Sequence, residues 1–331
     1  MNASKLWLAS LRRLPVPLPP VHGEVLGAYL HRLSAANGTK PPRLVKSLVP
    51  RWAGQMITER TATVHDWTPG ATERLSVLTG CQASLLNNYL PGLTRLGDRA
   101  NLVRARNTMR KACPWCMLRR GVSTTVLIYL PPTTQLCRAH GIWLRGDSHY
   151  RISHLPEVLR AQQRHHRLAK RYPETVEQAT MDTRRIIGLW QRQGWQPQLR
   201  RRWNDRLELL PLVECAKNQR FAPGQGDDER QSIVSYPEFV ALLELLAAPS
   251  WQARRVRREA STPKVRAAIA EFYDEAAHRL AVGSLHDLPT LLEPRHEPLY
   301  RWFDRRGRVR TGRAPESVPA DLQQGSSAAG H

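Results

Sequence analysis

Cys113-Pro114-Trp115-Cys116 and, after twenty intervening residues, Cys137-Arg138-Ala139-His140-Gly141 are the segments that decide the fold of this chain. Three thiolates and one imidazole in two close pairs suit one tetrahedral zinc ion. A metal with four protein ligands has no position open for water, so the pattern predicts an ion that stabilises the fold and takes no part in catalysis. The expected ligands are Cys113, Cys116, Cys137 and His140.

The residues between the two ligand pairs read as β structure. Thr124 to Leu130 is β-branched and apolar and is bounded by Gly121 and two prolines, which predicts a strand. Residues 141–144 could be its hairpin partner. We therefore expect a small zinc ribbon over residues 101–153. Buried cysteines beside a surface histidine are the weaker interpretation, because three of only five cysteines lie in this span.

The chain is strongly basic, with 50 Lys and Arg against 28 Asp and Glu and a net charge of +22. Residues 1–150 hold 20 basic and 6 acidic side chains, and no acidic residue lies between Asp98 and Asp147. This charge favours contact with nucleic-acid phosphates, although an acidic protein partner or a need for solubility would also account for it. Around the first cysteine pair the candidate contacts are Arg104, Arg106, Arg110, Lys111, Arg119 and Arg120.

The length and the cysteine content of the chain indicate how many modules it holds and in which compartment it works. A chain of 331 residues allows two or three modules, each with its own core. No run of eighteen apolar residues is present, so no membrane span is expected. The first thirteen residues lack the features of a signal peptide. Cys81 and Cys215 stand alone, which fits the reducing cytoplasm, where a nucleic-acid binder would associate with the nucleoid.

Residues 1–100 read as a helical module. Four prolines in the segment 14–21 exclude a helix there and predict an extended strap. A helix with one apolar face follows it, and a shorter helix starts at Pro41. A further helix carries Leu75 and Leu78, and after a turn at Gly80 another runs from Ala83 to Leu90. The side chains expected to face inward are Leu75, Leu78, Leu85, Leu86 and Leu90.

The corner at 71–90 resembles a helix-turn-helix. If this corner reads nucleic acid, its exposed positions Gln82, Asn87 and Asn88 are candidates for contact. Most such corners only pack two helices together. Packing and reading are therefore both open for this segment.

The second half of the chain is helical again. Helices are expected over 156–171, 173–193, 236–248 and 262–282. Residues 160–206 hold twelve basic and four acidic side chains, which predicts a second basic surface. Its candidate contacts are Arg160, Arg164, Arg167, Lys170, Arg171, Arg200, Arg201 and Arg202.

The expected fold is mainly α with a small β zinc ribbon. An N-terminal helical module with a helix-turn-helix-like corner takes residues 1–100, and the zinc ribbon takes 101–153. A C-terminal helical domain takes 154–303. Residues 304–331 are rich in Arg, Gly, Ser and Ala, which predicts a disordered tail.

No motif of a catalytic site is present. The chain lacks the Gly-x-x-x-x-Gly-Lys-Ser/Thr phosphate loop, His-Glu-x-x-His and Gly-x-Ser-x-Gly. Asp227-Asp228-Glu229 is the only tight acidic cluster, and it reads as part of a solvated Gly-rich loop. His165 and His166 read as surface residues. We therefore expect no enzyme, while a nuclease with carboxylates spread over its fold is a third alternative.

Taken together, these residues resemble the TniQ family, the targeting subunits of bacterial transposition systems. The resemblance rests on the proline strap, the helix corner and two motifs in a fixed order. The motifs are Gly23-Glu24-x-Leu26-x-x-Tyr29-Leu30-x-Arg32-Leu33 and Cys113-Pro114-x-Cys116 … Cys137-x-x-His140-Gly141. The resemblance covers residues 14–150 well.

The resemblance implies a non-catalytic adaptor. Such an adaptor links a DNA target, or an RNA-guided CRISPR effector complex with its guide RNA, to an AAA+ transposition ATPase of the TnsC or TniB type. It also implies a single structural zinc ion, because Cys215 has no partner cysteines for a second ribbon, and a homodimer as in some members. The alternative from another class is a stand-alone, sequence-specific DNA-binding regulator that reads DNA with the corner at 71–90.

Overall fold

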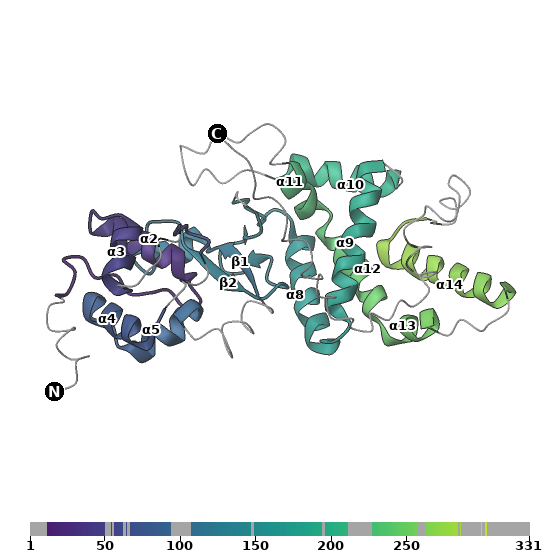
Figure 1. Cartoon of the computed structure of the whole chain (residues 1–331). Coiled ribbons are helices and arrows are strands. Elements are labelled where there is room, and N and C mark those ends of the chain that lie inside the picture. The colour runs from purple at the N-terminus through teal and green to yellow at the C-terminus, as the bar shows by residue number, and fades with distance from the viewer. Residues whose placement is uncertain are drawn as a thin grey trace, which may run out of the picture. The chain divides into compact units, whose positions relative to one another are not determined.

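The computed structural model (Figure 1) describes residues 12–49, 54, 56–61, 64, 67–93, 107–146, 149–193, 196–210, 227–256, 262–283, 285, 299 and 302. These residues are mainly helical, with two small antiparallel sheets. The chain divides into two compact units, Met1–Glu244 and Leu245–His331. The boundaries predicted near residues 100 and 153 lie inside the first unit and stay predictions. The predicted tail at 304–331 lies outside the described residues. No described helix is long and apolar enough to cross a membrane.

Short helices around one apolar core form the N-terminal helical module. They are α2 (Leu26–Ala36), α3 (Pro41–Leu48), α4 (Pro69–Thr79), α5 (Ala83–Tyr89) and the 3-10 turn η1 (Pro91–Leu93). The fully buried members of the core are Leu26, Tyr29, Leu30, Leu33, Val45, Leu75, Leu86 and Leu90. The predicted inward face of the corner is wrong at Leu85, which is 37 % exposed. It precedes the buried Leu86 by one residue, and successive helix positions point in different directions.

The corner between α4 and α5 depends on a glycine. The Thr68 side chain accepts a hydrogen bond from the Ala71 N–H at 3.2 Å and caps the start of α4. Gly80 ends α4 with a φ of +68°, a left-handed conformation that side chains other than glycine rarely adopt. The two helices and their turn are therefore present as predicted. Their role in reading nucleic acid stays a prediction.

A buried ion pair fastens the proline strap to this module. The Glu24 carboxylate accepts hydrogen bonds from the Arg32 guanidinium at 2.8 and 3.0 Å and from the Val21 N–H at 2.8 Å. Arg32 also donates to the Pro19 carbonyl at 2.9 Å. Burial raises the pKa of Glu24, and the hydrogen bond and charge of Arg32 oppose that rise. The Glu and Arg of the first motif therefore hold the strap in place.

The zinc ribbon consists of two separate two-stranded sheets. β1 (Thr108–Lys111) pairs antiparallel with β2 (Leu127–Leu130), and β3 (Leu136–Cys137) pairs with β4 (Ile142–Trp143). The predicted strand near 124–130 is present as β2, but the predicted pairing with 141–144 is wrong. Two prolines directly after β2 lack the N–H groups that a continued ladder needs. The partner of β2 is the earlier strand β1.

Strand β2 also joins the ribbon to the N-terminal helical module. The Val25 N–H donates to the Leu127 carbonyl, and the Tyr129 N–H donates to the Gly23 carbonyl, both at 2.8 Å. Gly23 has a φ of +75°, and a Cβ there would lie 3.4 Å from the Tyr129 carbonyl oxygen. Glycine allows both this backbone conformation and this approach. The Gly-Glu pair of the motif thus connects the strap, the first helix and the ribbon.

Further helices follow the ribbon in the first unit. They are α8 (Pro156–Arg171), α9 (Val176–Gln193), α10 (Pro197–Glu208), α11 (Asp227–Val234) and α12 (Tyr236–Ala247), which runs across the boundary between the units. The acidic cluster at 227–229 starts α11, so the prediction of a solvated loop there is wrong. Acidic side chains suit the first turn of a helix because they face its positive dipole end.

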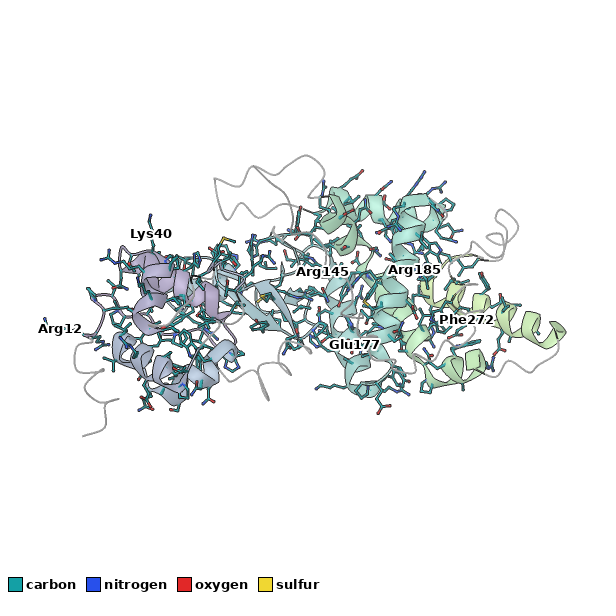
Figure 2. The ribbon with its side chains drawn as sticks, in the orientation of Figure 1. Arg12, Lys40, Arg145, Glu177, Arg185 and Phe272 are labelled. Carbon is teal, nitrogen blue, oxygen red and sulfur yellow. The ribbon has the colours of Figure 1, made fainter. Side chains whose placement is uncertain are left out.

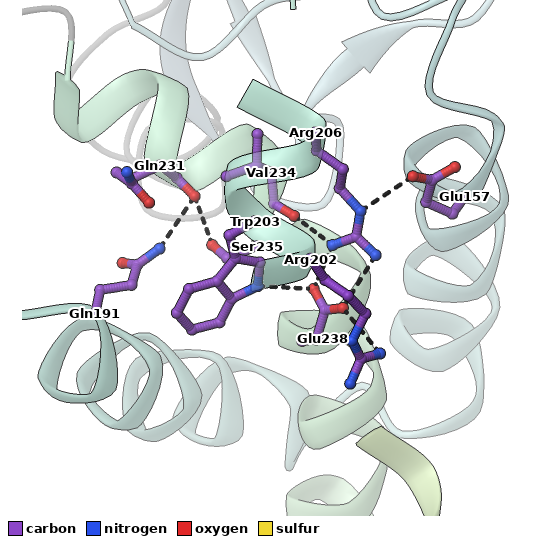
Figure 3. Close-up of polar contacts among 9 residues, drawn as sticks. All are labelled: Glu157, Gln191, Arg202, Trp203, Arg206, Gln231, Val234, Ser235 and Glu238. Carbon is purple, nitrogen blue, oxygen red and sulfur yellow. Dashed lines mark hydrogen bonds and ion pairs between the residues drawn. The ribbon is translucent and has the colours of Figure 1, made fainter. Parts of the chain in front are cut away.

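Arg206 joins α10 to three other helices, α8, α11 and α12 (Figure 3). Its guanidinium donates to the Glu238 carboxylate at 2.7 and 3.0 Å, to Glu157 at 3.0 Å and to the Val234 carbonyl at 2.6 Å. The Trp203 indole N–H donates to the same Glu238 at 3.1 Å. Arg206 and Glu238 are only 11 % and 3 % exposed. Arg206 is therefore a structural residue within the basic stretch 160–206.

A buried polar chain joins α8 to the ribbon and to α12. The Gln162 side-chain oxygen accepts hydrogen bonds from the Gln135 N–H at 3.0 Å and from the Tyr236 hydroxyl at 3.2 Å. His165 Nδ1 lies 2.8 Å from that hydroxyl, and the ring is buried. The prediction that His165 is a surface residue is wrong, because Tyr236 of α12 covers it. Burial lowers the pKa of His165 to about 4, so the ring is neutral near pH 7.

The second unit has an aromatic core. Its helices are α13 (Pro249–Val256) and α14 (Thr262–Leu280). Trp251 packs edge to face on Phe272 with 5.0 Å between the ring centroids. Trp302 stacks on Phe272 with 5.2 Å between the ring centroids. The helix predicted at 262–282 is present and contributes to a core, as its apolar pattern indicates.

Candidate zinc centre and nucleic-acid surface

Two turns of the ribbon bring the four predicted zinc ligands together. Cys113 directly precedes the short helix α7 (Pro114–Leu118), and Cys116 lies within it. Cys137 ends β3, and His140 lies in the turn that leads to β4. Gly141 follows with a φ of +58°, which lets the chain reverse directly behind the last ligand.

The four donor atoms have the spacing of a tetrahedral zinc site. The sulfurs of Cys116 and Cys137 are 3.7 Å apart, and His140 Nδ1 lies 3.4, 3.3 and 3.5 Å from the three sulfurs in chain order. All four atoms lie within 4.8 Å of one another. Zinc–sulfur bonds of about 2.3 Å and zinc–nitrogen bonds of about 2.0–2.1 Å would separate two sulfurs by about 3.8 Å and sulfur from nitrogen by about 3.5 Å. The residues therefore fit one zinc ion, as predicted.

The ligands must lose protons to bind the metal. The hydrogen bond with Cys113 lowers the pKa of Cys137 to about 4 and raises the pKa of Cys113. Metal binding must therefore displace the proton that the Cys113 and Cys137 sulfurs hold between them. Nδ1 of His140 faces the sulfurs, so the ring proton belongs on Nε2 in the metal-bound form.

The basic residues near the first cysteine pair fall into two groups. Arg119 and Arg120 are exposed just after α7. Arg110 is only 8 % exposed and donates to the Gln135 side chain at 3.0 Å and to the Pro132 carbonyl at 3.2 Å. Arg110 is thus a structural residue and does not belong to the exposed basic surface predicted from the sequence. Of the other candidates, Lys111 is half-buried. Arg104 and Arg106 lie outside the described residues.

The second predicted basic surface is clearest on α8. Arg160, Arg164, Arg167 and Arg171 are exposed and follow one another at spacings of four, three and four residues, which places them on one stripe of the helix. The buried side chains occupy another face: Val158, Ala161, Gln162, His165 and Leu168. The partly exposed Glu244 pairs with Arg164 at 2.5 Å. We call these four arginines the α8 arginine stripe.

The remaining candidates extend beyond this stripe. Lys170 is exposed on α8, and Arg200 and Arg201 are exposed on α10. Arg202 lies 3.6 Å from the buried Glu238 and is 34 % exposed (Figure 3). Arg185 of α9, which was not among the candidates, is exposed as well (Figure 2). The predicted surface is therefore spread over several helices.

Two exposed apolar residues beside the predicted zinc ligands were not among the candidates predicted from the sequence. Trp115 is 40 % exposed and Leu118 is 52 % exposed, both on α7. The available signal was a tryptophan placed between two metal-binding cysteines, with a leucine three residues later. In the same short helix Met117 is buried, so Trp115 and Leu118 lie on the outer side of the turn.

Residues 15–144 match the TniQ family model. The match starts in the proline strap and ends just after β4, so it spans the Gly-Glu helix, the corner and the zinc ribbon. No curated protein and no solved structure matches the chain. A TniQ domain implies a transposon-associated protein. Residues 15–144 of this chain therefore form a TniQ domain.

Proposed function

We propose that this protein is a non-catalytic target-selection adaptor in transposition. It links a DNA target, or an RNA-guided CRISPR effector complex with its guide RNA, to an AAA+ transposition ATPase of the TnsC or TniB type. The observation that carries this proposal is the TniQ match over residues 15–144. An ion bound by Cys113, Cys116, Cys137 and His140 has no open position for substrate, so its part is structural.

The exposed arginines support a nucleic-acid partner. The α8 arginine stripe places four guanidinium groups along about three turns of one helix. Arg119 and Arg120 add two more charges on the ribbon. Side chains of this kind bind phosphates without reading sequence, and their binding weakens steeply as salt rises. Such contacts would orient the adaptor on a target that another component has selected.

Reconstitution of transposition tests the proposal. A donor element, its transposase and ATPase and a defined target are combined with and without this protein. We expect insertions at the selected target only when the protein is present, together with co-purification of the ATPase. Purified protein that binds neither the ATPase, nor a target complex, nor DNA at low salt would rule out the adaptor role. Sedimentation of the free protein tests the proposed homodimer.

A stand-alone DNA-binding regulator is the second candidate. It is favoured by one observation: Gln82, Asn87 and Asn88 of the corner are all exposed. Amide side chains read adenine edges in the major groove. This function requires tight binding to one short duplex at moderate salt, and alanine at these positions should relax the sequence preference. Equal affinity for unrelated duplexes would exclude it.

A further inference from the structure

Trp115 of the zinc ribbon is a large aromatic side chain on the protein surface. It is 40 % exposed, whereas the other described tryptophans are buried or half-buried. Exposing a large indole to water is unfavourable, and tryptophan is enriched at contact surfaces relative to the rest of the protein surface. Cys113 and Cys116 flank it in the sequence, so zinc binding fixes the backbone that carries the ring. The ring is thus presented by a rigid turn.

The surroundings of Trp115 combine apolar surface with positive charge. Leu118 lies three residues further along α7, on the same side of this short helix, and is 52 % exposed. Arg119 and Arg120 follow directly and are exposed. Neither arginine forms an ion pair with any residue in the described part of the chain. The ribbon itself offers none, since no Asp or Glu lies between residues 98 and 147.

We propose that Trp115 is a stacking platform for an unpaired base of single-stranded nucleic acid, with Arg119 and Arg120 binding the neighbouring phosphates. An aromatic ring beside cationic side chains is the common arrangement for single strands, because every base has a π face and every linkage has a negative charge. Leu118 supplies apolar surface for the sugar. Paired bases in a duplex do not offer their faces, so the platform distinguishes single strands from duplex.

Charge decides between nucleic acid and a protein partner. An apolar protein surface would cover Trp115 and Leu118 but would leave two guanidinium groups without a counter-charge. Each nucleotide carries a flat base and a phosphate close to it. This pair matches an aromatic side chain that is followed closely by two arginines. The inference rests on the proposed function only in that both require contact with nucleic acid, and it is tested separately from transposition.

Binding of fluorescein-labelled strands to the full-length, zinc-loaded protein tests the platform. The probes are short oligothymidine, oligouridine of equal length and a mixed-sequence duplex. Trp115→Ala should weaken binding of a single strand by about 5- to 100-fold and duplex binding much less. Trp115→Phe should restore most of the affinity because it restores the ring. The double variant Arg119→Gln with Arg120→Gln should have a shallower slope of log affinity against log salt concentration, by the amount that about two phosphate contacts contribute.

Controls separate stacking from loss of the fold. Each variant is compared at one bound zinc ion per chain, and Met56→Ala, which alters another exposed apolar side chain in the first unit, should change nothing. A stronger effect on oligothymidine identifies DNA as the ligand, and a stronger effect on oligouridine identifies RNA. Unchanged single-strand binding by zinc-loaded Trp115→Ala overturns the proposal. It is equally overturned if duplex binding falls as much, or if only capture of the ATPase is lost. If the wild-type protein supports transposition but binds no single strand, the stacking platform is overturned and the proposed function stands.

Discussion

The N-terminal helical module and the zinc ribbon are neighbours in one unit but are stabilised by different means. The module has a large apolar core that draws on all its described helices. The apolar clusters of the ribbon contain no more than four buried residues each, and one of them includes Cys113 itself. Hydrophobic burial is enough for the first region. The second buries less apolar surface, and we propose that a zinc ion held by its four ligands supplies the missing stability.

This difference separates the parts of the protein that hold shape from those that meet partners. The zinc ligands and the Glu24–Arg32 pair face inward and hold the scaffold. The α8 arginine stripe and Trp115 face water. Changes to the scaffold should alter stability, and changes to the surface should alter binding with little effect on stability.

Loss of a zinc ligand should give the largest effect. Structural zinc contributes about 10–16 kcal/mol in small modules, so Cys113→Ser should release the ion and unfold the ribbon while the N-terminal helices persist. Metal content and far-UV circular dichroism measure the two consequences. Cys81→Ser, which changes a cysteine outside the cluster, should retain zinc. A Cys113→Ser protein with one zinc ion and an unchanged melting temperature would refute structural zinc.

Removing the charge of Glu24 should damage both regions at once. Glu24→Gln leaves Arg32 buried without a counter-charge, which costs about 3–5 kcal/mol of the free energy of unfolding. Because the strap and β2 meet at this point, both the module and the ribbon should loosen. Urea unfolding compares this variant with Glu177→Gln on the exposed surface of α9 (Figure 2), which should lie near wild type. Equal stability of the two variants would contradict the proposed role of the pair.

A cavity in the helical core should affect the module alone. Leu75 is fully buried in α4, so Leu75→Ala should lower the free energy of unfolding by about 2–5 kcal/mol. Zinc content should not change, since the four ligands lie outside that core. Leu85→Ala on the exposed side of α5 is the matched control and should cost much less. Loss of zinc from the Leu75 variant would mean that the two regions are not independent.

Neutralising the α8 arginine stripe should have the smallest effect on stability. Arg160→Gln, Arg167→Gln and Arg171→Gln together should change the free energy of unfolding little, because all three side chains are exposed. Affinity for duplex DNA should fall. The slope of log affinity against log salt concentration should become shallower by the amount that about three phosphate contacts contribute. Glutamine at Lys40, directly before α3, and at Arg43 and Lys46 within α3 removes the same charge elsewhere and serves as control. If both triple variants lose equal affinity, net charge alone explains the binding.

Local patterns in the sequence were enough to predict much of the scaffold. Ligand spacing identified the zinc set, four prolines identified the strap, and apolar periodicity identified the helices on both sides of Gly80. Each of these features depends on residues close together in the chain. Strong local chemistry therefore gave reliable predictions.

Features that depend on distant residues were missed. The pairing of β1 with β2 brings together strands on either side of α7, and no local pattern specifies it. His165 is buried because α12, some seventy residues later, covers it. Arg110 and Arg206 look like surface cations in the sequence, yet each finds buried acceptors on other elements. Charge alone does not show whether a guanidinium faces water or a distant partner.

Hydrogen exchange of the wild-type protein, measured with one bound zinc ion and again after chelation, tests the central claim most directly. We predict that chelation removes protection from 107–146 while α2, α4 and the core around Leu75 stay protected. Protection that is unchanged in the ribbon, or lost equally in both regions, would contradict the claim that zinc stabilises the ribbon and hydrophobic burial stabilises the module.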